Sequence, residues 1–261
     1  MKTYLGLSCY DDYLATDWNT KQYDGYILGD AFCNKRMFRH GDLGLIESIN
    51  RANLLNKEVI YQTPMYLTDR TFAKETDKII YLHEKMGVKK LLVQDIGLIM
   101  WLSKNIPDIE IIWSRLGKTR NSIMNHGFIE FLQSIGISSI EVESPEKARA
   151  IAMYGFFIYS VFGSINYMTL SRDCYNKYML NRFDGACERE CNRADTTLRH
   201  QNFKMSVDGH FLGLRIMYDS SAEFYQTVKD CATSIMLYAS DKNIAVKKLQ
   251  MIRNSLLLEE E

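Results

Sequence analysis

Four of the six cysteines in this sequence are spaced so that they could hold an inorganic cofactor. Cys187 and Cys191 form a C-x3-C pair, Cys174 lies shortly before them, and Cys33 lies far upstream. Four thiolates suit a 4Fe–4S cluster, because each iron takes one cysteine ligand. The residue types therefore predict an iron–sulfur site held by Cys33, Cys174, Cys187 and Cys191.

Basic side chains accompany these cysteines in the sequence. They are Lys35, Arg36, Arg172 and Arg189. Positive charge favours the thiolate form and would offset the negative charge of a cluster. Two alternatives stay open: a zinc site with cysteine ligands, whose usual C-x2-C knuckles are missing, and ordinary small core residues. The sequence also lacks the CxxxCxxC pattern of radical-SAM proteins.

Other polar residues are expected where predicted strands end, and they could line a substrate pocket. We predict a substrate-binding role for Asp30, Lys35, Arg36, Gln62, Asp95, Arg115, Glu143 and Arg172. Ionisable residues at barrel strand ends are functional candidates, and a guanidinium such as that of Arg115 suits a carboxylate. The alternative for Asp95 is a helix cap before Ile96.

Short apolar runs alternate with helical patterns and would position these residues. The predicted strands are 4–9, 25–28, 58–62, 90–93, 110–113, 139–142, 155–161 and 234–239. Nearly continuous apolar runs are typical of parallel strands buried on both faces. Helical patterns cover 43–55, 71–86, the segment after 119, a start at Ser144-Pro145-Glu146, 222–230 and 242–257. The pattern predicts a (β/α)8 barrel, with a doubly wound open sheet as the alternative.

One segment interrupts this alternation between the seventh and eighth strands. Residues 166–199 are polar, rich in Cys and Arg, and without clear periodicity, which predicts an irregular cluster-binding insertion in a single domain of 1–261. Residues 203–217 then read as a hairpin around Asp208-Gly209. In a barrel, Cys33 would follow the second strand and the other three the seventh, at the same carboxyl-end face.

The bulk composition narrows the function classes. The chain has 261 residues and a formal net charge of zero, so nothing points to a nucleic-acid partner. No apolar run reaches the length of a membrane span and no signal peptide is visible, which predicts a cytoplasmic protein. In that compartment disulfides are unexpected, and Cys9 and Cys231 are expected to be buried structural thiols. His83-Glu84 lacks the second histidine of a zincin motif, and no GxGxxG or P-loop occurs.

Two stretches carry a resemblance to a known family. The segment 26–36, which ends in Cys33-Asn34-Lys35-Arg36, and the spacing of the three later cysteines resemble the UbiV-like branch of the collagenase-like peptidase family (U-thirty-two). The resemblance implies a (β/α) barrel with a 4Fe–4S cluster. It also implies oxygen-independent hydroxylation in ubiquinone biosynthesis, a UbiU-like partner in a heterodimer, and prephenate as a possible oxygen donor.

The sequence also departs from the wider family. Peptidase members carry a Val-His-Gly-type motif followed by an early cysteine, whereas this chain has Val161-Phe162-Gly163. Because this histidine is missing, a peptidase with a structural zinc site is the least favoured of the candidate functions. A non-catalytic iron–sulfur scaffold or electron-transfer subunit remains an alternative, and the hydroxylated molecule could be a quinone precursor, another small molecule or RNA.

Overall fold

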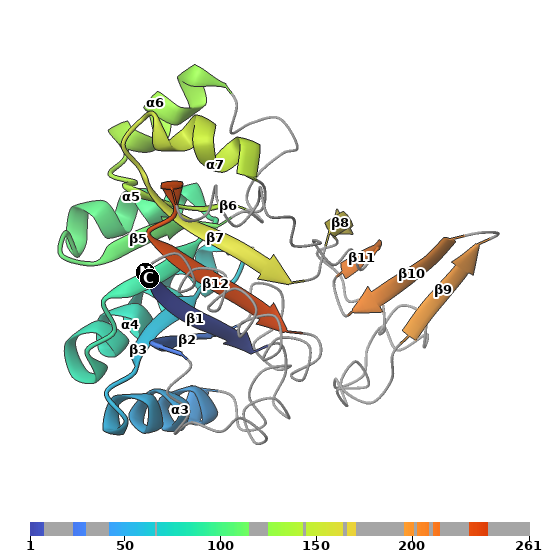
Figure 1. Ribbon diagram of the computed structural model, residues 1–261. Helices are drawn as coiled ribbons and strands as arrows, with labels where there is room; N and C mark the ends of the chain where they lie inside the picture. The colour runs from blue at the N-terminus through green and yellow to red at the C-terminus, as the bar shows by residue number, and fades with distance from the viewer. Residues whose placement is uncertain are drawn as a thin grey trace, which may run out of the picture.

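A closed barrel of eight parallel strands forms the centre of the molecule in this computed structural model (Figure 1). The structure describes residues 1–7, 23–29, 42–65, 67–114, 125–142, 145–163, 166–170, 196–200, 203–208, 211–214 and 230–239. The barrel strands are β1 (Lys2–Leu7), β2 (Gly25–Leu28), β3 (Glu58–Gln62), β4 (Lys90–Val93), β5 (Glu110–Trp113), β6 (Ser139–Val142), β7 (Phe157–Gly163) and β12 (Ser234–Ala239). Pairing of β12 between β1 and β7 closes the ring. The predicted barrel is therefore confirmed.

The strand bounds follow the apolar runs closely, with two differences. The first strand, Lys2–Leu7, begins two residues before the predicted range of 4–9, because its pairing with β12 begins at Lys2; residues 8 and 9 lie outside the described residues. The seventh is Phe157–Gly163 rather than 155–161, since Gly155 has a positive φ of 79° and belongs to the turn before the strand. Local apolarity marks a buried strand, but pairing with neighbours decides where it begins and ends.

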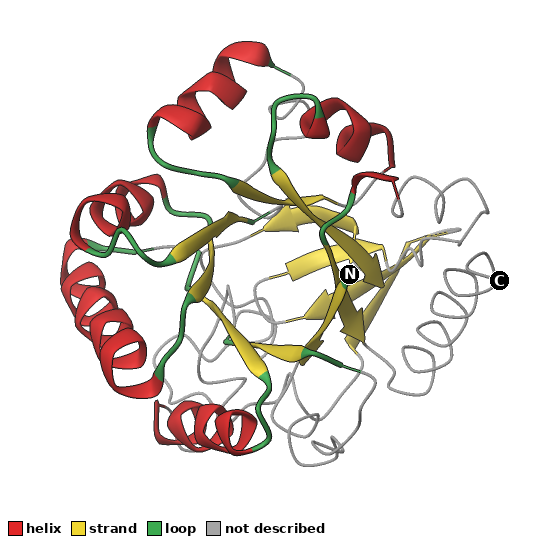
Figure 2. Ribbon diagram, turned by 60° about the vertical axis from the view of Figure 1, so that its left-hand side comes forward, coloured by secondary structure: helices red, strands yellow, loops and turns green. Residues whose placement is uncertain are grey.

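Helices cover the outside of the barrel (Figure 2). They are α3 (Asp42–Leu54), α4 (Asp69–Met86), α5 (Ile96–Asn105), α6 (His126–Ser134) and α7 (Pro145–Ala152). Thr68 caps α4 in a capping box, and Gly87 in the left-handed conformation ends it. The predicted helices at 222–230 and 242–257 lie almost wholly outside the described residues.

A second sheet is inserted between β7 and β12. It has four strands, ordered β8 (Asn166–Leu170), β11 (Phe211–Leu214), β10 (Phe203–Asp208) and β9 (Thr196–His200). The hairpin predicted around Asp208-Gly209 is confirmed as the antiparallel β10–β11 pair. The prediction of irregular structure throughout 166–199 was wrong at its two ends, which form β8 and β9. β8 pairs with β11 and β9 pairs with β10, so the partners of both strands lie later in the chain. The segment itself therefore shows no local periodicity.

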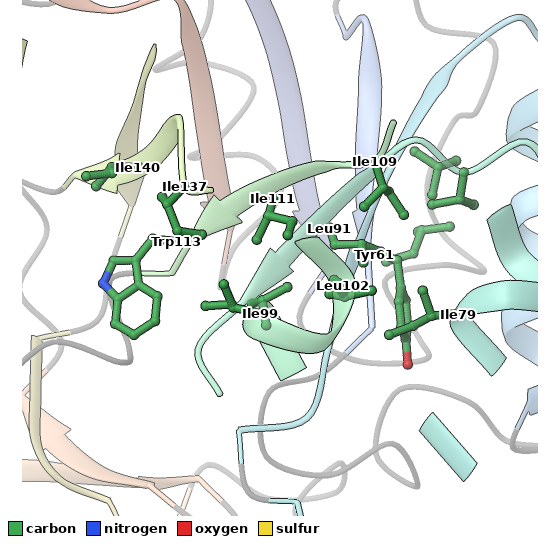
Figure 3. Close-up of a cluster of buried hydrophobic side chains, with 14 of the residues drawn as sticks. Tyr61, Ile79, Leu91, Ile99, Leu102, Ile109, Ile111, Trp113, Ile137 and Ile140 are labelled. Atoms are coloured by element: carbon green, nitrogen blue, oxygen red, sulfur yellow. The ribbon is translucent and has the colours of Figure 1, made fainter. Parts of the chain in front are cut away.

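Two apolar clusters hold the barrel together. The larger one, which we call the outer cluster, lies between strands and helices. Figure 3 shows Tyr61, Ile79, Leu102, Trp113 and other side chains packing there. The smaller one fills the barrel itself and consists of Tyr4, Ile27, Ile60, Leu92, Ile112, Tyr159, Val161 and Met236. Alternate residues of each strand therefore face opposite clusters. In the described part of the chain, no helix is long and apolar enough to cross a membrane.

Candidate functional site

Polar side chains gather inside the barrel at the carboxyl ends of β3 to β6. Leu92 and Ile112 fill the barrel interior, so the alternation of side chains turns Gln94 and Ser114 inward as well. Glu141 points inward because Ile140 and Val142, on either side of it, pack in the outer cluster. All three polar residues are buried, with exposed fractions of 6% for Gln94, 0% for Ser114 and 1% for Glu141. We call Gln94, Ser114 and Glu141 the polar rim.

The backbone holds the polar rim in register across three neighbouring strands. The amide of Ser114 donates to the carbonyl of Val93 at 2.8 Å, which continues the β4–β5 ladder past the last strand residue. The pairing of Trp113 with Ile140 brings Ser114 beside Glu141. Ser114 Oγ donates to Glu141 Oε2 at 2.9 Å, so a hydroxyl orients the buried carboxylate. Neighbouring strands lie about 4.8 Å apart, and the three side chains share one side of the barrel mouth.

The amide of Gln94 is only partly satisfied. Its Nε2 donates to the carbonyl of Thr63 at 3.0 Å, and this bond fixes the orientation of the amide because a carbonyl can only accept. Oε1 therefore points away from Thr63. Across the described residues, no group donates a hydrogen bond to this buried oxygen. A buried acceptor without a donor costs about 1–3 kcal/mol and calls for an explanation.

The opposite, amino-terminal mouth of the barrel holds an ionic cluster around Lys90. Lys90 Nζ lies 3.2 Å from Glu58 Oε2 and 3.5 Å from Glu110 Oε2. It also donates to the hydroxyls of Tyr4 at 3.0 Å and Tyr159 at 3.3 Å. Burial and hydrogen bonds to the glutamates raise the pKa of both tyrosines above the usual range. We call these five residues the Lys90 cluster, and its place at the amino ends of the strands indicates a stabilising role.

The pKa of Glu58 makes the Lys90 cluster sensitive to acid. Burial alone would raise this pKa, but hydrogen bonds from Lys2 and Tyr4 and the charge of Lys90 outweigh that effect and lower it to about 2. The unfolded chain takes up this proton near pH 4.5. Between these two pH values the unfolded state binds more protons, so stability is present above pH 4.5 and is lost as pH falls toward 2.

We expect Glu58→Gln to cost about 1 kcal/mol near neutral pH, a discounted figure because the carboxylate is partly exposed to solvent. The difference from the wild type should shrink as the pH falls below about 4.5, since the wild-type carboxylate then begins to lose its advantage. Urea unfolding of both proteins at a series of pH values measures this difference in the free energy of unfolding. Glu84→Gln, on the exposed side of α4, is the control. A difference that stays constant with pH would show that Glu58 acts only through packing.

Two of the predicted substrate-binding residues lie in the described part of the chain. Gln62 ends β3 and is 8% exposed, at the same mouth as the polar rim. Asp95 caps α5, because its carboxylate accepts a hydrogen bond from the amide of Leu98 at 2.9 Å. The cap is the alternative that the sequence had left open for Asp95. The remaining predicted residues, Asp30, Lys35, Arg36, Arg115, Glu143 and Arg172, lie outside the described residues.

The predicted cluster cysteines, Cys33, Cys174, Cys187 and Cys191, also lie outside the described residues. The strands that precede them are described. The chain leaves β2 at Leu28 and β7 at Gly163, and both strands end at the same mouth because all barrel strands are parallel. The three later cysteines lie in sequence between β8 and β9, which belong to the second sheet. Cys231 is described, and it packs half-buried against the outer cluster.

Sequence reasoning missed the polar rim as a unit. A signal was present: Glu141 stands between Ile140 and Val142 in a short apolar run, which indicates a buried carboxylate. Gln94 and Ser114 each follow directly on an apolar run. A single sequence shows such residues one at a time, whereas their meeting depends on strand order.

Comparison with solved structures supports the barrel. The U32 peptidase Mk0906 matches with a TM-score of 0.56 and 12% identity, over 93% of this chain and 94% of that one. A glycerol uptake operon antiterminator-related protein from Thermotoga maritima matches with a TM-score of 0.48 and 12% identity, over 94% and 98%. A glycerophosphodiester phosphodiesterase from Parabacteroides distasonis gives 0.49 and 8% identity, over 97% and 98%. At these identities the match to Mk0906 shows a shared fold and nothing more. The other two matches, with TM-scores below 0.5, do not add to that conclusion.

Sequence comparison identifies the family. No curated protein sequence matches the chain. The sequence profile described as Peptidase family U32 matches residues 24–235, which reach from the turn before β2 into β12. This match covers most of the barrel and the whole second sheet, and it agrees with the fold of the U32 peptidase Mk0906. The chain belongs to peptidase family U32.

Proposed function

We propose that this member of the family is an iron–sulfur protein of the UbiV type and a subunit of an oxygen-independent hydroxylase. The observation that carries the proposal is the set of four cysteines in the sequence, one after β2 and three between β8 and β9. The two strands that lead toward these segments, β2 and β7, end at the same mouth of the barrel. Active sites of such barrels lie at the carboxyl ends of the strands.

The donor set fits the proposed cofactor. Cys33, Cys174, Cys187 and Cys191 would each hold one iron of a 4Fe–4S cluster, and the cluster would supply redox chemistry or an open iron edge for an oxygen donor. Lys35, Arg36 and Arg172 would keep the thiols deprotonated and could bind an anionic donor such as prephenate. The polar rim would line the neighbouring side of the same mouth.

The proposal includes a partner. We propose a UbiU-like protein that forms a heterodimer with this chain, since the resemblance is to the branch that works in such pairs. Affinity purification without oxygen, followed by mass spectrometry, tests this point. Recovery of a second member of the same family supports the heterodimer, whereas a chain that is active alone would make the partner unnecessary.

We expect Cys33→Ala to abolish the cluster, because the fourth iron would lose its protein ligand. The wild type, purified without oxygen, should be brown and contain about four iron and four sulfide per chain. The variant should contain far less of both, as measured by iron and acid-labile sulfide analysis. Cys231→Ala is the matched control, since that cysteine packs against the outer cluster and should leave the iron content unchanged.

Other outcomes of the same measurement separate the alternatives. If Cys33→Ala contains as much iron as the wild type, Cys33 is not a ligand of the cluster. A colourless wild-type protein with one zinc per chain would favour a structural zinc site. A brown wild type that transfers electrons but supports no hydroxylation, even with its partner, would favour the electron-transfer subunit.

A further inference from the structure

Two described residues flank the segment that carries Cys33. The structure describes the chain up to Gly29, which directly follows β2, and again from Asp42, the first residue of α3. Residues 30–41 connect them in the sequence and contain Cys33. Side chains that hold Gly29 and Asp42 in place therefore fix both ends of this segment.

Tyr61 on β3 holds the first end. A β-carbon added to Gly29 would lie 3.1 Å from a ring carbon of Tyr61 and 2.3 Å from the carbonyl oxygen of Gln62, so the ring packs directly on the Gly29 backbone. The Tyr61 hydroxyl donates to Glu75 Oε1 on α4 at 2.7 Å. Both side chains are buried, and a hydrogen bond to a charged group is stronger than one between neutral groups. This bond fixes the orientation of the ring against Gly29.

Lys78 connects Glu75 to the second end. It lies one turn after Glu75 on α4, and its Nζ is 3.0 Å from Glu75 Oε2 and 3.3 Å from Asp42 Oδ1. The same nitrogen donates to the Tyr61 hydroxyl at 3.4 Å. The side chain of Lys78 is 16% exposed, and burial alone would lower its pKa. The charges of Glu75 and Asp42 outweigh this effect and raise the pKa, so the ammonium stays charged between the two carboxylates.

We call Tyr61, Glu75 and Lys78 the Lys78 network. A largely buried ion pair contributes little net stability, because both charges lose their water, and its best-attested use is to specify a geometry. An exposed carboxylate such as that of Asp42 gains little from a lysine that is free to move. Here Glu75 and Tyr61 hold the ammonium in place beforehand, so its contact with Asp42 specifies where α3 begins. The network thus forms a continuous path of contacts from Gly29 to Asp42.

We propose that the Lys78 network positions Cys33 by holding both ends of the segment 30–41, and so determines how firmly the cluster is retained. This inference rests on the proposed function, since it needs an iron–sulfur cluster with Cys33 as a ligand. The members of the network are positioning residues, because they act on the thiol through Gly29 and Asp42. Without the network the barrel still closes through its backbone pairing, but the two ends of the segment are no longer tied together.

We expect Lys78→Met to release iron to a ferrous-iron chelator about tenfold faster than the wild type, because loss of a largely buried ion pair favours local opening of the segment. The proteins are purified without oxygen, and release is followed by the absorbance of the iron–chelator complex, well below the melting temperature of either protein. Lys78→Arg should restore slow release, since a guanidinium also pairs with carboxylates. Unchanged release from Lys78→Met would overturn the proposal.

Lys90→Met is the matched control for a general loss of stability. It also removes a lysine that contacts two carboxylates, but at the amino-terminal mouth of the barrel. Its iron release should stay at the wild-type rate. Equal acceleration in Lys78→Met and Lys90→Met would show that iron release follows overall stability, which would overturn a positioning role.

Hydrogen exchange at the start of α3 provides a readout that does not depend on iron. Measured by mass spectrometry on the same samples, it should be about tenfold faster in Lys78→Met and unchanged in Lys90→Met. Faster exchange with unchanged iron release would show that the network holds α3 but not Cys33, against the proposal. If Lys78→Met does not fold, Asp42→Asn breaks the network at its exposed end and should shift both readouts in the same direction.

The two measurements also separate this inference from the proposed function. A wild type that contains no iron would refute the iron–sulfur proposal. Hydrogen exchange then decides whether the network holds the segment: faster exchange in Lys78→Met supports this, and unchanged exchange overturns it.

Discussion

Replacing Lys90 by methionine is expected to lower the free energy of unfolding by about 2 kcal/mol. Lys90 is the only described cation between Glu58 and Glu110 that contacts both carboxylates, at 3.2 and 3.5 Å. Its removal leaves two carboxylates, with side chains 36% and 30% exposed, without their shared counter-ion. Breaking partly buried ion pairs from one side is costly because the remaining carboxylates stay partly desolvated, but the cost is below that of a fully buried pair because solvent reaches both carboxylates and Glu58 keeps its ion pair with Lys2.

The aromatic neighbours of Lys90 add to this effect. The ammonium lies 5.4 Å from the ring centroid of Tyr4 and 5.8 Å from that of Tyr159, within the range of cation–π attraction. Methionine keeps most of the volume, so the loss should reflect charge rather than a cavity. For a domain of this size, the melting temperature should fall by about 4–8 °C.

Calorimetry or urea unfolding measures the change, and two controls define its origin. Lys104→Met, on an exposed part of α5, should stay within about 0.5 kcal/mol of the wild type. A triple variant that adds Glu58→Gln and Glu110→Gln to Lys90→Met should recover much of the loss, because a neutral cluster of similar shape carries no uncompensated charge. A triple variant as unstable as Lys90→Met would show that the lysine stem, not its charge, matters.

Gly29→Ala is expected to cost about 3 kcal/mol or more, and to disturb the carboxyl-end mouth of the barrel. Gly29 directly follows β2 with φ of 115°, a conformation that residues with a side chain rarely adopt. A β-carbon there would lie 2.3 Å from the backbone carbonyl oxygen of Gln62 and 3.1 Å from a ring carbon of Tyr61. A backbone oxygen on a neighbouring strand cannot move aside without disrupting the β2–β3 pairing.

Gly155→Ala is the matched control for this substitution. Gly155 also has a positive φ, 79°, but a β-carbon there would meet nothing within 4 Å. Gly155→Ala should lower the free energy of unfolding by about 1 kcal/mol, because only the positive φ is unfavourable for alanine there. Urea unfolding of both variants separates the two contributions. Similar losses would mean that the β2–β3 contact relaxes easily.

Iron analysis of Gly29→Ala joins this prediction to the proposed function. Cys33 follows Gly29 closely in the sequence, so a displaced exit from β2 should lower the iron content even if the fold survives. Gly155→Ala should keep its iron, because Gly155 lies at the opposite end of the barrel, before β7 begins. The same pair of variants therefore tests both the fold and the cluster.

The sequence alone determined most of the barrel. A parallel strand buried on both faces must be apolar along its length, so runs such as 58–62, 90–93 and 110–113 predicted the strands at their observed bounds. The Asp95 cap was also readable, because capping is a contact between residues a turn apart. Such features depend on neighbours in the chain, and the sequence contains those neighbours.

Only the tertiary structure decided what meets inside the barrel. The Lys90 cluster joins five residues that lie on five different strands, and the polar rim joins the ends of three. The alternation of a strand shows that Gln94 faces the same side as Leu92 and that Glu141 faces away from Ile140 and Val142, but not that their strands lie on either side of β5. The two outer strands of the second sheet, β8 and β9, were missed for the same reason. Register and strand order arise when the barrel closes, and closure depends on the packing of all strands at once rather than on any local pattern.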